Sequence, residues 1–191
     1  MRNPRRSKPI NWFVLGIIAL PLIAVGAYFW AMGIFSALES YRSPLANTPP
    51  APGVELGEPL TRRLVIVLMD ALRYDTSIDE TVMPVLNDLR AEGASAIMTS
   101  RPPSFSAPGW TALLTGAWPD INDGQPFNPP DEFNVRAFTQ DDIFAAADRA
   151  GLNTAVSGYF WFEDMLAGRG VDAGFYTHGE DNAADQEVVA A

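Results

Sequence analysis

The stretch Leu64-Val-Ile-Val-Leu-Met-Asp70 decides the fold class of this chain. A continuous apolar run with several β-branched residues is typical of a strand buried on both faces, as in parallel sheets. Asp70 ends this run, and a carboxylate at the end of a buried strand has to be hydrogen-bonded, ion-paired or bound to metal. Asp70 is therefore the first candidate site residue, although a plain cap on the next turn would use it equally well. The nearby Arg73 and Asp75 are expected to form a local ion pair.

Helices and strands alternate after this run. The sequence predicts helices over 83–89 and 141–150 and strands over 94–99, 152–157 and 174–177. Gly93 ends the first helix. The second helix has Gln140 or Asp141 near its cap and Gly151 at its end. This order predicts an α/β fold, namely part of a mostly parallel sheet with flanking helices. In such sheets the functional groups lie beyond the carboxyl ends of the strands.

Ser106 is the second candidate. It precedes a helix expected over 107–114, which has Pro108 in its first turn and Gly116 as its stop. A serine at this place often only caps the helix. The same place also favours a phosphate, because a helix N-terminus offers unpaired N–H groups and positive potential. A metal ion there would convert the hydroxyl into a nucleophile. Ser104 and Thr111 are weaker candidates.

The N-terminal part predicts a membrane anchor. Residues 11–36 carry no charge and are long enough to cross a bilayer as a helix. A cleaved signal peptide is the alternative, with a small-residue site at Ala24-Val-Gly26, but cleavage there would leave an apolar new N-terminus. The basic residues in 1–10 favour a cytoplasmic N-terminus. The chain is thus expected to be a single-pass membrane protein whose domain is extracytoplasmic.

Residues 37–61 are expected to form a proline-rich linker that holds the domain, 62–191, away from the membrane. From Tyr41 onward the chain has nine basic and 22 acidic residues, a formal charge of −13. Such a surplus would repel phosphate backbones, so nucleic-acid binding is excluded. The absence of cysteine from the sequence excludes disulfides, thiolate metal sites and cysteine nucleophiles.

Three sequence segments together resemble the alkaline phosphatase superfamily. They are Val65-Ile-Val-Leu-Met-Asp-Ala-Leu-Arg73, Pro103-Ser-Phe-Ser-Ala-Pro108 with Leu114-Thr-Gly116, and Met83-Pro-Val-Leu86. The likeness is greatest to the type I phosphodiesterase/nucleotide pyrophosphatase branch and to the ethanolamine-phosphate transferases of glycolipid anchor synthesis. It covers residues 62–125 well and continues weakly to about 185. The fold that it implies is the first part of an alkaline-phosphatase-like domain.

The resemblance implies that Asp70 is a metal ligand and that Ser106 both binds metal and attacks phosphorus. The cofactors implied are two divalent metal ions, with zinc expected, and the second site is not encoded in this chain. The substrate would be a phosphoester. Gly109 departs from the pyrophosphatase branch, where an asparagine often binds phosphoryl oxygens, and this weakens a nucleotide assignment. Trp110 and the aromatic run 159–162 would line a pocket or, as we expect, pack in the core.

The resemblance implies further aspartates and several histidines for such a site, which the related families supply from segments downstream of the region seen here. His178 is the one histidine of this chain, and we expect it in a loop rather than at a metal. The sequence after Asn182 starts like a capped helix without a terminator, from which we expect the natural protein to continue. The main hypothesis is a membrane-anchored phosphodiesterase or phosphotransferase that is incomplete, and hence inactive, as this chain alone. The alternative is a non-catalytic accessory subunit of a membrane complex. A sulfatase is a weaker option, because Ser106-Ala-Pro-Gly-Trp110 lacks the arginine of that motif.

Overall fold

The computed structural model describes residues 12–54, 57–58, 61–102, 104–129, 131 and 133–191. The chain divides into two compact units, Met1–Tyr41 and Arg42–Ala191. The predicted basic tail, 1–10, and the first residue of the predicted membrane segment lie outside the described residues.

The first unit is the single helix α1 (Trp12–Glu39), which contains Pro21 and buries none of its side chains. Its 28 residues rise about 42 Å at 1.5 Å each, more than the roughly 30 Å of a bilayer's hydrocarbon core. By length and composition this helix is able to cross a membrane. At its end, Ser40 donates from its backbone N–H and its hydroxyl to the Ser36 carbonyl.

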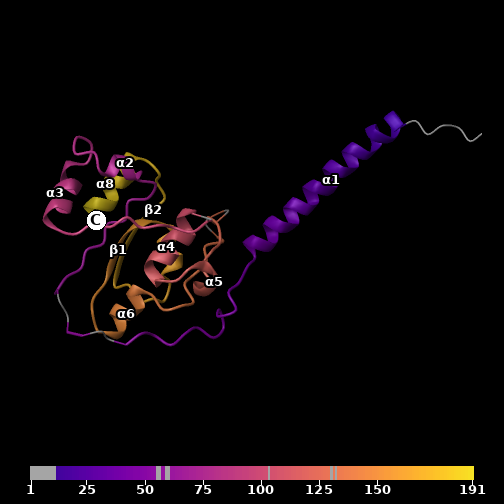
Figure 1. Ribbon diagram of the computed structural model, residues 1–191. Helices are drawn as coiled ribbons and strands as arrows, with labels where there is room; N and C mark the ends of the chain where they lie inside the picture. Colours follow the sequence, from indigo (N-terminus) through magenta and orange to yellow (C-terminus); the bar gives the residue numbers. More distant parts are fainter. Residues whose placement is uncertain (1–11, 55–56, 59–60, 103, 130, 132) are drawn as a thin grey trace, which may run out of the picture. The chain divides into compact units, whose positions relative to one another are not determined.

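The second unit contains a parallel pair of strands, β1 (Ala155–Tyr159) and β2 (Ala173–Thr177), in the register Ala155 to Ala173 (Figure 1). Helix α7 (Trp161–Met165) lies in the crossover between them. A parallel pair needs a connection of about a dozen residues, and residues 160–172 supply it. With its flanking helices this sheet confirms the α/β class. The predicted strands 152–157 and 174–177 correspond to β1, which starts and ends later, and to β2.

Prolines, glycines and side-chain caps mark several of the helix ends. The other helices are α2 (Tyr74–Ser77), α3 (Pro84–Glu92), α4 (Ser106–Thr115), α5 (Pro119–Asn122), α6 (Ile143–Arg149) and α8 (Asn182–Ala190). Helix α3 has proline at its start and ends at Gly93, as predicted. Asp142, rather than Gln140 or Asp141, caps α6 by accepting from the N–H groups of Phe144 and Ala145.

Two predicted strands are wrong. Residues 64–69 and 94–99 are extended, but within the described part of the chain neither pairs with a strand. Their large side chains are exposed: Val65 is 74 % exposed and Met98 is 80 % exposed. An apolar run indicates only that a segment favours burial, whereas a strand also needs a neighbouring strand to which it hydrogen-bonds. In the sheet of the described residues, β1 pairs only with β2, so neither segment has such a neighbour.

The core of the second unit forms where α4 packs against the region around α7. Its buried members are Ala107, Trp110, Leu114, Phe138, Met165 and Leu166. Trp110 stacks on Phe162 with ring centroids 4.7 Å apart and also contacts Tyr159 and Trp161. This confirms core packing as the role of Trp110 and of most of the aromatic run. It also fixes α4, and with it the position of Ser106.

Candidate active site

The structure brings together the two candidate residues of the sequence analysis. The Ser106 hydroxyl donates a hydrogen bond to Asp70 Oδ2 at 2.6 Å, although the two residues are 36 positions apart. Asp70 is exposed and Ser106 is half-buried, so a substrate in solution can reach the pair. Ser106 is not a plain helix cap, since α4 has no side-chain cap at its N-terminus.

Asp70 is held by the turn that follows it. Its Oδ1 accepts a hydrogen bond from the Ala71 N–H at 2.8 Å, which leaves Oδ2 for the serine. Ala71 has φ +56°, a left-handed conformation that costs a residue with a Cβ about 1–2 kcal/mol. The strain lies directly beside the candidate residue, where the fold needs a sharp turn at the end of the extended run.

Ser106 is the first residue of α4, one position later than a cap. The helix continues to Thr115 and stops at Gly116, whose φ is +69°, as the sequence predicts. The N-terminus of α4 is anchored from outside, because the Asn128 side-chain oxygen accepts from the Ala107 N–H at 3.0 Å. Asn128 carries no motif, and nothing in the sequence pointed to it.

The first turn of α4 has little unused hydrogen-bonding capacity. Ala107 donates to Asn128, Pro108 has no N–H, and Gly109 donates to the Phe105 carbonyl. Among the described residues nothing accepts from the backbone N–H of Ser106. An anion at this helix end would therefore meet the Ser106 N–H and the positive end of the helix dipole. Gly109 is exposed, and a Cβ built on it would meet nothing within 4 Å.

The weaker candidates lie elsewhere. Thr111 is fully buried, and its hydroxyl donates to the Ala107 carbonyl of the same helix at 2.8 Å. Its role is therefore structural, within α4. Ser104 is exposed. His178 follows β2 in an exposed loop, as expected, and stacks on Phe160 with ring centroids 4.3 Å apart. Arg73 and Asp75 form the predicted ion pair, and the hydrogen bond from Arg73 holds the pKa of Asp75 below its ordinary value.

Asp70 and Ser106 supply only part of the ligand set that a metal site needs. Zinc in proteins takes four ligands, and this pair supplies one carboxylate and one hydroxyl. In the described ranges no group of three or more His, Cys, Asp or Glu side chains is placed to hold a metal ion. A metal at this pair would need ligands from elsewhere.

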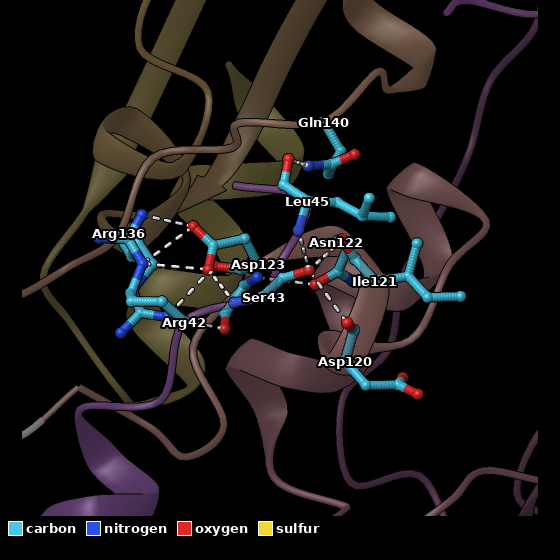
Figure 2. Close-up of polar contacts among 10 residues, drawn as sticks. Arg42, Ser43, Leu45, Asp120, Ile121, Asn122, Asp123, Arg136 and Gln140 are labelled. Carbon is cyan, nitrogen blue, oxygen red and sulfur yellow. Dashed lines mark hydrogen bonds and ion pairs between the residues drawn. The ribbon is translucent and has the colours of Figure 1, made fainter. Parts of the chain in front are cut away.

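A second polar cluster was not predicted. Asp123 has φ +58° and a fully buried side chain, and it accepts from the Arg42 guanidinium and from the Ser43 N–H (Figure 2). Arg136 donates to the backbone carbonyls of Asp123 and Gly124. Burial opposes the ionisation of Asp123, but the bonds from Arg42 and Ser43 outweigh it and keep its pKa below the ordinary value. No signal in the sequence links residues 80 positions apart.

Comparison with known proteins identifies the family. The model of the type I phosphodiesterase / nucleotide pyrophosphatase family matches residues 64–179. The chain belongs to this family. The matched residues include Asp70, Ser106 and all of β1 and β2, and they exclude α1. No curated protein and no solved structure matches the chain. Membership in this phosphodiesterase family supports a phosphoester hydrolase-like function.

Proposed function

We propose that this chain carries the nucleophile of a membrane-anchored phosphodiesterase or phosphotransferase, with Ser106 attacking phosphorus. The observation that carries the proposal is the 2.6 Å hydrogen bond from Ser106 Oγ to Asp70 Oδ2, made at the N-terminus of a helix within the family's matched region. Serine and aspartate are a suitable pair for this chemistry, because the carboxylate accepts the proton that the hydroxyl must lose.

The geometry defines a role for each group. The hydrogen bond directs the Ser106 proton toward Asp70 Oδ2, which leaves the oxygen lone pairs for a phosphorus atom. An O–P bond to Ser106 forms, the bond from phosphorus to the leaving alcohol breaks, and the leaving oxygen takes the proton that Asp70 accepted. Water, or an acceptor alcohol, then displaces the serine from phosphorus. The Ser106 N–H and the α4 dipole would stabilise the charge on the phosphoryl oxygens.

The family relationship also implies metal dependence. Divalent metal, with zinc expected, would lower the pKa of the hydroxyl and neutralise phosphoryl charge. In this chain Asp70 and Ser106 would be two of the ligands, and the metal, rather than Asp70, would then favour loss of the Ser106 proton. The rest would come from outside the described residues, so we expect this chain alone to be inactive.

Anchoring to a membrane is the second part of the proposal. It rests on the length and apolar composition of α1, whose side chains are all unburied. With the basic tail inside, the domain would be extracytoplasmic. Its partners would then be the lipid bilayer and a phosphoester substrate.

The function is tested on the natural protein extracted from its own membranes. We expect it to hydrolyse bis-p-nitrophenyl phosphate with added Zn²⁺, and we expect Ser106→Ala to remove this activity. Ser104→Ala is the matched control, because Ser104 is an exposed serine two positions away and should leave the rate unchanged. Full activity in Ser106→Ala would rule out the serine as nucleophile.

A non-catalytic accessory subunit is the second candidate. It is favoured by the absence, in the part of the chain that the structure describes, of a three-ligand metal group. Under this hypothesis the natural protein would show no hydrolysis with any divalent metal and would purify in fixed ratio with other membrane proteins.

A further inference from the structure

Phe105 comes directly before Ser106, and neither the sequence motif nor the hydrogen bond to Asp70 assigns it a role. Phe105 is 47 % exposed, although phenylalanine is a residue that favours burial. Its backbone is extended, with φ −76° and ψ 163°, and its carbonyl accepts a hydrogen bond from the Gly109 N–H. The start of α4 therefore holds an aromatic ring beside the serine with part of its surface open to solvent.

A second aromatic ring supports Phe105. Phe127, which is half-buried, meets it edge to face, with ring centroids 5.4 Å apart and the ring planes at 72°. The next residue, Asn128, accepts from the Ala107 N–H. Residues 127 and 128 thus contact the two residues that flank Ser106 in the chain, and all of them lie in the unit Arg42–Ala191. We call Phe105 and Phe127 the ring pair.

The geometry of displacement at phosphorus indicates which part of a substrate the ring pair would meet. The attacking and leaving oxygens lie roughly in line on opposite sides of phosphorus, so the leaving alcohol points away from Ser106. The retained ester group of a phosphodiester projects sideways, toward residues that flank the serine. Phe105 is the closest of these in the chain, with its Cα about 3.8 Å from that of Ser106.

The charge of the unit indicates which ester group fits. From residue 42 onward the chain has nine basic and 22 acidic residues, a formal charge of −13, which repels an ester group with further phosphates. The arginines nearest in sequence to the two site residues already have partners: Arg73 pairs with Asp75, and Arg101 lies over the Trp118 ring at 5.2 Å. The exposed surface of Phe105, by contrast, gains free energy when an apolar group covers it.

We propose that the ring pair binds the retained ester group of the substrate and selects phosphodiesters in which this group is aromatic. The inference rests on the proposed function, because a retained ester group exists only where Ser106 attacks a phosphodiester. The bonds made and broken at phosphorus are those described above, and neither ring takes part in proton transfer. Phe105 and Phe127 determine specificity through contact with the substrate.

Two substrates with the same leaving group isolate the contact. Bis-p-nitrophenyl phosphate and methyl p-nitrophenyl phosphate both release p-nitrophenol, and they differ only in the retained group, which is aryl or methyl. In the natural protein with Zn²⁺, we expect Phe105→Ala to lower kcat/KM about tenfold for the aryl substrate and less than twofold for the methyl substrate. Phe105→Tyr keeps the ring and should retain both rates.

The matched control is Phe133→Ala, which removes a more exposed phenylalanine, 87 % exposed, from outside the ring pair. It should change neither rate. Thermal unfolding confirms that each variant is folded, as expected for truncation of exposed side chains.

Equal effects of Phe105→Ala on the two substrates, or no effect on either, would overturn the role of the ring pair. The proposed function would still stand in that case if Ser106→Ala removed the hydrolysis of both. Hydrolysis of neither substrate by the unaltered protein would instead contradict the proposed function, and with it this inference.

Discussion

Ser106 Oγ and Asp70 Oδ2 lie 2.6 Å apart and share a hydrogen bond, although the extended run that leads to Asp70 and the helix that begins at Ser106 are separated by two other helices in the chain. The bond joins the two main candidate site residues of the sequence analysis, the expected nucleophile Ser106 and the expected metal ligand Asp70. Its first consequence concerns Asp70. We expect Asp70→Asn in the natural protein to lower kcat/KM by about 100-fold or more, because a carboxamide is both a poorer proton acceptor and a poorer metal ligand than a carboxylate. Steady-state hydrolysis measures this.

The control for Asp70 is Asp75→Asn, five positions later. It also removes an exposed carboxylate, but the one that pairs with Arg73 rather than with the serine. We expect less than a twofold change in kcat/KM. Equal losses of kcat/KM in the two variants would show that Asp70 contributes only its negative charge and not its contact with Ser106.

Asn128 is expected to position the nucleophile helix. In Asn128→Ala the Ala107 N–H loses its acceptor, which should cost about 1 kcal/mol and lower Tm by about 2–4 °C. Activity should fall with it, since Ser106 is the neighbouring residue. Asn134→Ala is the comparison, because the Asn134 side chain bonds only the exposed Asp131 in the described structure. Calorimetry distinguishes them, and an unchanged Tm in Asn128→Ala would contradict the assigned contact.

Relief of the backbone strain at Ala71 should increase stability, unlike the loss expected for Asn128→Ala. Ala71→Gly should raise the free energy of unfolding by about 1 kcal/mol, because glycine adopts φ +56° without a Cβ penalty. In the exposed helix α3, Ala91→Gly should instead lower it by about 0.5–1 kcal/mol. Denaturant titration measures both. A loss of stability in Ala71→Gly would mean that the turn is not strained.

The buried ion pair between Asp123 and Arg42 should weaken only in acid. The folded-state pKa of Asp123 lies below its unfolded value of about 3.9, so the carboxylate stabilises the fold above that value and loses this effect as pH falls through the folded pKa. The charged groups that face it are the guanidinium groups of Arg42 and Arg136, which stay protonated throughout. The loss of Tm caused by Asp123→Asn should therefore be constant from pH 7 to 5 and shrink only below about pH 4, as thermal unfolding at each pH measures. A transition near pH 6 would contradict this assignment.

The candidate site residues could be predicted from the sequence, but the long-range contacts of other residues in the domain could not. Asp70 and Ser106 each stand at the end of a recognisable local pattern, an apolar run and a helix start, and helix boundaries such as Gly93 and Gly116 follow from local backbone preferences. Asn128 and Asp123 act through partners 21 and 80 positions away, and no local pattern encodes such contacts.

The strand predicted over 64–69 shows where sequence patterns mislead, because the structure has no strand there. Its composition is that of a buried parallel strand, yet its side chains are exposed, because pairing depends on a neighbour that local sequence does not specify. By contrast, β1 and β2 are connected through α7 within a short stretch of chain, and both were predicted with small shifts in their ends.

The most direct test of the account is to trap the covalent intermediate on Ser106. The natural protein is mixed with bis-p-nitrophenyl phosphate, quenched in acid within milliseconds, digested and analysed by mass spectrometry. We predict a p-nitrophenyl phosphate ester on Ser106 that is absent from Ser106→Ala and that accumulates when the acceptor step is slowed. Turnover of the substrate with an unmodified Ser106 at every quench time, or with the adduct on another residue, would contradict the assignment of Ser106 as the nucleophile.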